Sequence, residues 1–143
     1  MFPMDTRFQK LAELLVRHSC QVKPGEHLLL ELFDAPEAMA VAMVEATRAA
    51  GGHPHVTLRS NRVMRALNKE SGEEGLRIWG ECDLERMKHM QCYVGIRGAA
   101  NVSEMSGIPP EQMKLVGKLY AKPVHFEQRV NHTKWAVLRW PSP

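Results

Sequence analysis

The chain has 143 residues, of which 44% are hydrophobic and 24% charged, a balance that excludes a disordered tail and allows one globular core. The 19 Lys and Arg residues against 16 Asp and Glu leave a formal charge of +3, well below the clustered excess of a dedicated nucleic-acid-binding protein. No apolar run approaches the roughly 18 residues that span a membrane, and the N-terminus lacks a targeting pattern. We expect a soluble, cytoplasmic protein that binds neither nucleic acid nor membrane.

Three widely spaced cysteines, Cys20, Cys82 and Cys92, form no CxxC pair and have no catalytic signature around them. An odd set of this kind indicates neither a disulfide framework nor a zinc knuckle. We interpret all three as buried structural thiols in a reducing compartment.

Predicted helices and strands alternate along the chain. Apolar residues at helical spacing follow Asp5, a candidate N-cap, and the near-continuous apolar run at 27–33 is typical of a strand covered on both faces. The expected elements are a helix over 6–19, a strand over 27–33, a helix ending before Gly51-Gly52, a strand over 54–60, two helices between 61 and 90 broken around Ser71-Gly72, a strand over 91–97, a long helix from Pro109 that is interrupted or kinked at Pro123, and a strand over 133–140.

Strands separated by ten or more helical residues indicate right-handed βαβ units. The predicted fold class is therefore α/β: a mainly parallel sheet of about four or more strands with helices on both faces, in a Rossmann-like or flavodoxin-like three-layer sandwich. The chain contains no repeat, low-complexity tract or obvious linker, so we expect residues 1–143 to form a single domain.

Two histidine groups resemble metal sites. A catalytic zinc needs three protein ligands, and we interpret His53-Pro54-His55 as a structural turn that enters a strand, with the two rings held apart. We expect His125, Glu127 and His132 to lie on a solvated helix surface, because Glu127 falls off the helical face that the two histidines share. A small zinc hydrolase built on His53 and His55 stays open as the weakest hypothesis.

A glycine pair and an arginine group point to a different alternative. Gly95 and Gly98 form a GxxG at the end of a predicted strand, where α/β folds bind their ligands, but they match no complete phosphate-binding motif. Arg59, Arg62 and Arg65 bring together guanidinium groups that suit a carboxylate or a phosphate. The alternative function is therefore a self-contained phosphate- or nucleotide-binding α/β module. The structural interpretation of the same residues is a tight turn at the glycines and a solvated basic helix face at the arginines.

Several segments in order resemble one known family. They are HSCQVKPGEHLLLELFDAPE, AGGHPHVTLRSNRVMRAL, YVGIRGAANVSEMSG, PPEQMKL and TKWAVLRWPSP. From about Phe8 to Pro143, the chain is similar to the N-terminal part of the thermophilic metallo-aminopeptidase family, which includes aminopeptidase T and aminopeptidase S. In that family an N-terminal α/β domain precedes a larger catalytic domain. The resemblance therefore implies that WAVLRWPSP is a last strand and the start of a connection to a catalytic domain absent from this chain.

The same resemblance implies an activity for a longer parent protein. Members hold two divalent metal ions (zinc, cobalt, magnesium or manganese), remove N-terminal amino acids from short peptides, and assemble as homodimers. None of their metal-binding motifs matches a position here, so we assign no catalytic and no metal-binding residue and expect this chain alone to be inactive. We expect it to shape the substrate cavity and support the dimer, with Arg59, Arg97 and Asn101 at strand ends as candidate cavity-lining residues.

Overall fold

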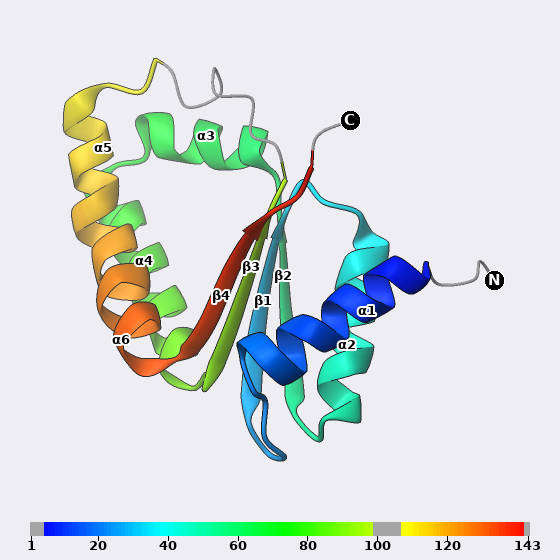
Figure 1. Cartoon of the computed structure of the whole chain (residues 1–143). Coiled ribbons are helices and arrows are strands. Elements are labelled where there is room, and N and C mark those ends of the chain that lie inside the picture. The colour runs from blue at the N-terminus through cyan, green and yellow to red at the C-terminus, as the bar shows by residue number, and fades with distance from the viewer. Residues whose placement is uncertain (1–4, 99–106, 142–143) are drawn as a thin grey trace.

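The computed structural model describes residues 5–98 and 107–141 of the chain (Figure 1). Within these residues, one sheet of four parallel strands has the order β2-β1-β3-β4. The strands are β1 (His27–Phe33), β2 (His53–Arg59), β3 (Cys92–Arg97) and β4 (Lys134–Arg139). The predicted α/β class with helices on both faces of a parallel sheet is confirmed.

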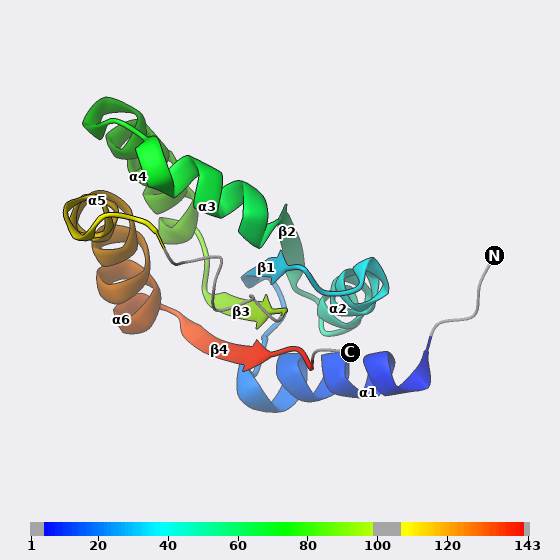
Figure 2. The same cartoon turned by 90° about the horizontal axis from the view of Figure 1, so that it is seen from above.

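The helices form a layer on each face of the sheet (Figures 1 and 2). One layer consists of α1 (Thr6–Leu14), its π-helical continuation η1 (Leu15–Ser19), and α2 (Glu37–Ala49). The other consists of α3 (Asn61–Glu70), α4 (Glu73–Lys88), α5 (Pro110–Val116), the π-helical η3 (Gly117–Arg129) and the short α6 (Val130–His132). None of the helices in the described residues is long and apolar enough to cross a membrane.

The sheet face under α1 and α2 is dry and apolar. Successive side chains of a strand point to opposite faces, so Leu28, Leu30 and Leu32 of β1 all face these two helices. They pack with Val94 and Ile96 of β3 in one buried cluster. This cluster forms the larger part of the core.

The opposite sheet face combines a smaller apolar cluster with polar groups. Leu29 of β1 and Tyr93 of β3 pack against Leu76 of α4 and residues of η3. A Cβ at Gly80 would collide with the carbonyl oxygen of Leu119, so glycine is what allows α4 and η3 to approach this closely. Toward the carboxyl ends of the strands, this layer carries the ionisable side chains described below.

The long helix after Pro109 differs from an ordinary kinked α-helix. Pro123 lies inside η3, a π-helical segment of 13 residues, whose backbone bonds span five residues instead of four. Its buried residues Tyr120, Val124 and Arg129 therefore recur at intervals of four and five. This wider spacing changes which side chains face the sheet.

Candidate functional site

A cavity of about 330 Å³ lies beside the carboxyl ends of β1, β2 and β3, on the face covered by α3, α4 and η3. Strands β1 and β3 are neighbours in the sheet, and the helices that follow them lie on opposite faces (Figure 2). Open α/β sheets bind ligands where connections diverge in this way, because a crevice forms between them. The cavity therefore occupies the position at which this fold class binds ligands.

Two of the three residues expected to line a cavity lie here. Arg59 and Arg97 end β2 and β3, both pair with Phe33 in the parallel register, and both line the cavity. Asn101 lies outside the described residues. That the two arginines border the substrate in a longer enzyme stays a prediction.

Glu31 is the centre of a polar cluster that we define as Glu31, Arg59, Asp83, Tyr93 and Tyr120. Its carboxylate is 2% exposed and accepts hydrogen bonds from Arg59 Nε at 2.7 Å and from the Tyr93 hydroxyl at 2.8 Å. Burial acts to raise the pKa of Glu31, but these hydrogen bonds outweigh it and hold the pKa below its usual value. Glu31 is therefore ionised at neutral pH and fixes Arg59 against the sheet.

The other side of Arg59 contacts a second carboxylate. Arg59 Nη2 donates to Asp83 Oδ2 at 3.0 Å, and the Tyr120 hydroxyl donates to the same oxygen. The Tyr120 ring stacks on Trp79, with 4.1 Å between the ring centroids. Because Arg59 is held by two carboxylates, its main role in the described structure is to join the sheet to α4.

His125 lines the same cavity, so its expected place on a solvated helix surface is wrong. Its side chain is 14% exposed and Nδ1 accepts a hydrogen bond from Arg129 Nε at 2.9 Å. Burial lowers the pKa of His125 to about 4, opposed by Glu31 and reinforced by the neighbouring arginines. His125 is therefore neutral at pH 7. Because Nδ1 accepts a hydrogen bond, the proton of the neutral ring is on Nε2, and this nitrogen lies 3.7 Å from Glu31 Oε1. Glu127 and His132 are exposed, as expected.

Arg129 is a buried cation beside His125. It is 8% exposed, and its guanidinium carbon lies 5.0 Å from the Tyr93 ring centroid and 4.8 Å from that of Trp135. Within the described part of the chain its Nη1 is buried and has no hydrogen-bond partner. Arg97 also lines the cavity, with its guanidinium carbon 5.0 Å from the Phe33 ring centroid. The cavity thus contains two arginines that aromatic rings, and not carboxylates, hold in place.

The histidines form a separate group at the opposite, amino-terminal end of the sheet. The expectation that the rings of His53 and His55 are held apart is wrong, because residues i and i+2 of a strand share a face. Both rings lie beside His27, at centroid distances of 4.8 and 5.1 Å, and His27 Nδ1 is 2.8 Å from His55 Nε2. Even so, the described residues contain no group of three His, Cys, Asp or Glu side chains able to hold a metal ion.

The glycine pair has a structural explanation. A Cβ at Gly98 would collide with the backbone oxygen of Asp34, so glycine allows the segments after β1 and β3 to lie against each other. A Cβ at Gly95 would crowd the Tyr93 ring at 3.1 Å. Arg62 is exposed, and Arg59 is held by Glu31 and Asp83, so these two arginines do not converge on one ligand.

The thiols are only partly as expected. Cys20 and Cys92 are buried, and burial raises the pKa of Cys20 to about 11 and that of Cys92 to about 12, which disfavours a nucleophilic thiolate. Cys82 is exposed, so the expectation that all three are buried is wrong. The exposed position follows from the outer face of α4.

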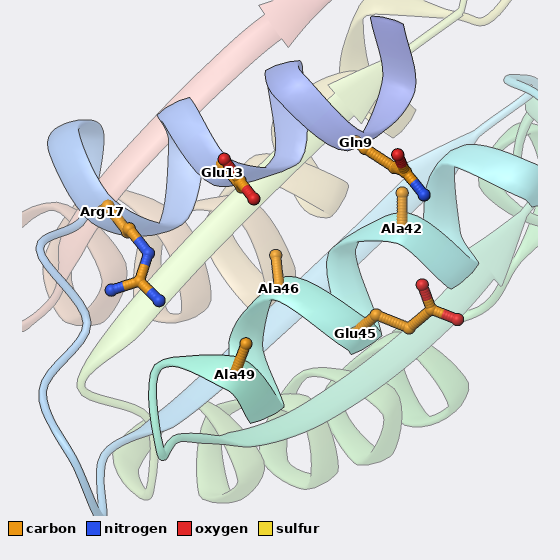
Figure 3. A pocket seen from close by; sticks show the side chains of 7 residues that line it. All are labelled: Gln9, Glu13, Arg17, Ala42, Glu45, Ala46 and Ala49. Atoms are coloured by element: carbon orange, nitrogen blue, oxygen red, sulfur yellow. The ribbon is translucent and has the colours of Figure 1, made fainter. Parts of the chain in front are cut away.

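A second depression, of about 300 Å³, lies between α1 and α2 (Figure 3). Alanines on α2 leave a small-residue stripe, over which longer polar side chains of α1 and η1 extend. The residues around it are Gln9, Glu13, Arg17, Ala42, Glu45, Ala46 and Ala49. It contains no buried unpartnered polar group among the described residues, and we assign it no function.

Sequence reasoning missed three residues of the cavity region: Glu31, Tyr93 and Arg129. Glu31 alone had a visible signal, as the only carboxylate within the apolar strand run HLLLELF. A charge inside a run that is otherwise buried needs a partner. Which partner it finds depends on strand register and on the π-helical turn, and neither can be read from residue spacing.

Comparison with known proteins identifies the family. A sequence model of the family "Thermophilic metalloprotease (M29)" matches residues 4–143. The chain belongs to this family. The M29 resemblance expected from the sequence motifs is thereby confirmed, while none of the curated proteins compared with the chain matches it.

A solved structure gives the same fold. Wild-type AmpT from Thermus thermophilus is similar to this M29 chain, with a TM-score of 0.72 and 18% sequence identity. The similar region covers 99% of this chain but only 37% of the AmpT chain. This chain therefore spans little more than a third of the length of that protein, and at this identity the likeness concerns the fold alone.

Proposed function

We propose that this chain is the N-terminal, non-catalytic domain of a dinuclear-metal aminopeptidase that removes N-terminal amino acids from short peptides. The observation that carries the proposal is the family match over residues 4–143, combined with coverage of only 37% of a structural relative. A part of the longer protein outside these residues then carries the catalytic groups.

In this proposal the metal ions are bound by the catalytic part of the longer protein. Metal-assisted peptide hydrolysis requires several His or carboxylate ligands on each ion. The residues at 5–98 and 107–141 contain no group of three such side chains arranged for a metal. We therefore derive no step of hydrolysis through residues of this chain, and the choice among zinc, cobalt, magnesium and manganese rests with the catalytic domain.

The role of this domain is to shape the substrate cavity and to support a homodimer. The position of Arg59 and Arg97 at the carboxyl ends of parallel strands supports the first part. Exposed apolar side chains along β2 and α2, including Leu58 at 55% exposure, support contact with the catalytic domain or a second subunit. The three free thiols support a reducing, cytoplasmic location.

The alternative of a self-contained phosphate- or nucleotide-binding module has less support. Arg59 is engaged by two carboxylates, Gly98 serves close backbone packing after β3, and Gly95 leaves room for the Tyr93 ring. A phosphate cradle instead needs consecutive free backbone N–H groups at a helix start.

An activity measurement on the purified 143-residue chain tests the proposal. With zinc, cobalt or manganese added, we expect no release of p-nitroaniline from leucine p-nitroanilide, while circular dichroism confirms that the chain is folded. Metal-dependent release by this chain would contradict a non-catalytic role. Reading the coding sequence beyond Pro143 gives the complementary result: an in-frame segment rich in Glu, His and Asp is expected, and an immediate stop codon argues against the proposal.

A further inference from the structure

The cavity at the strand ends has an excess of positive charge. Arg59 is balanced by Glu31 and by the adjacent Asp83, with Arg59 N to carboxylate O distances of 2.7 and 3.0 Å. Arg97 and Arg129 form no ion pair with any described residue. Glu31, which is paired with Arg59, is the carboxylate that lines the cavity and acts on Arg129 from a distance. The three arginines of the lining therefore outnumber its carboxylate, and an anionic ligand would offset the cost of this excess charge.

Arg129 is held ready for such a ligand. The Tyr93 and Trp135 rings lie beside its guanidinium, and Nε is engaged by neutral His125. Among the residues that the structure describes, Arg129 Nη1 is buried and has no partner. A guanidinium fixed in this way loses little conformational entropy when it binds an oxyanion, and the planar fork suits a carboxylate.

Arg97 lies close enough to Arg129 for their charges to interact. Burial lowers the pKa of Arg129, and the positive charge of Arg97 lowers it further, while Tyr93 and Glu31 act to raise it. Both side chains line the same cavity. An anion bound between them would replace this repulsion with two charge-assisted hydrogen bonds.

The remaining lining indicates an organic ligand larger than a simple ion. Trp79 and Phe126 supply aromatic surface, and Asn68 Oδ1 is a second buried polar atom without a hydrogen-bond partner in the described residues. The Asn68 oxygen can accept a hydrogen bond only from a donor such as an amide N–H, whereas Arg129 Nη1 can only donate one, for example to an oxyanion. The volume of about 330 Å³ lies within the range of small-molecule sites.

We propose that this cavity binds the carboxylate of a small peptide-like molecule, with Arg129 and Arg97 on the carboxylate, Asn68 on an amide N–H and the aromatic rings against the ligand's side chain. The choice of a peptide acid among organic carboxylates rests on the proposed function. In the longer enzyme the site would select peptides that have a free C-terminus.

Binding to the 143-residue chain tests the proposal directly. The probes are the tripeptide Leu-Gly-Gly, its C-terminal amide and inorganic phosphate, each titrated by calorimetry or by tryptophan fluorescence. We expect Leu-Gly-Gly to bind at least about tenfold more tightly than either of the other two, because only it combines a carboxylate with amide N–H groups.

Variants locate the binding site. Arg129→Gln and Arg97→Gln are each expected to weaken Leu-Gly-Gly binding about tenfold or more, while the exposed control Arg62→Gln leaves it unchanged. Thermal melts verify folding, and half-buried Arg97 provides the test if Arg129→Gln fails to fold. The proposal is overturned if the amide binds as tightly as Leu-Gly-Gly, or if phosphate binds equally or more tightly. It is also overturned if Leu-Gly-Gly does not bind to millimolar protein at up to a 10-fold molar excess of the peptide.

The result is separable from the proposed function. A chain that fails to bind the tripeptide can still be part of an active aminopeptidase, whose activity is measured in the longer protein. If the chain binds the tripeptide but its coding sequence continues into no metal-binding segment, the carboxylate site is supported and the proposed function is contradicted.

Discussion

The two faces of the sheet are built from the same strands but have different physical characters. On the α1 and α2 side, Leu28, Leu30 and Leu32 of β1 pack in a dry cluster. On the other side, alternate residues of the same strand are Leu29, which is apolar, and Glu31, which is ionised and hydrogen-bonded. One face therefore depends mainly on close packing, and the other depends also on electrostatics. This difference predicts that substitutions on the two faces differ in the size of the stability loss and in its dependence on pH.

Truncation on the dry face is expected to have the largest effect. Leu30 is 1% exposed, so Leu30→Ala removes buried methyl groups and leaves a cavity, at a cost of about 2–5 kcal/mol in the free energy of unfolding. The matched control is Leu58→Ala on the edge strand β2, where the side chain is mostly exposed. Urea denaturation at pH 7 measures both. Equal losses would mean that the face under α1 and α2 is not the packed core.

Charge removal on the polar face is expected to cost less. Glu31→Gln keeps the size of the side chain but removes the charge that binds Arg59 and Tyr93, at a cost of about 2 kcal/mol. Exposed Glu85→Gln serves as the control, since surface ion pairs contribute little. The loss should shrink in acid, because the stabilisation by a carboxylate of lowered pKa is complete above its ordinary pKa of 4.5 and is lost as the pH falls through the lower pKa of the folded state. A loss that is the same at pH 7 and pH 3.5 would contradict the charge-based account.

The smallest effect expected is a pH dependence from His125. Its pKa is about 4 in the folded chain, against 6.5 for an ordinary histidine, so the unfolded chain takes up the proton first as the pH falls. Stability is then complete above pH 6.5 and falls as the pH drops toward 4, by about 1 kcal/mol at pH 5.5. His55, whose pKa burial and His27 also lower, acts in the same direction.

Substitution isolates the contribution of His125 to this pH dependence. His125→Gln should flatten the decrease in unfolding free energy between pH 7.5 and pH 5, relative to its own value at pH 7.5. The exposed control His132→Gln should retain the slope of the unmodified chain. Identical slopes for all three proteins would mean that His125 is not buried beside Arg97 and Arg129 in solution.

The sequence by itself determined the order of elements and the strand ends. The sequence pattern identified the ends of all four strands to within one residue. For the central strands β1 and β3 the reason is that burial on both faces demands a continuous apolar stretch. The carboxyl-end rule for parallel strands then brought Arg59 and Arg97 to one edge of the sheet, where both line the cavity. These conclusions need only local pattern and the general geometry of βαβ units.

Only the tertiary structure decided which charges meet. Glu31, Tyr93 and His125 come from three distant segments, and they converge because of the register between β1 and β3 and the wide turns of η3. A helical-face argument placed His125 in solvent, since it assumed 3.6 residues per turn where the chain forms a π-helix around Pro123. The partner of a buried charge is set by packing across the fold, and spacing along the chain does not contain that information.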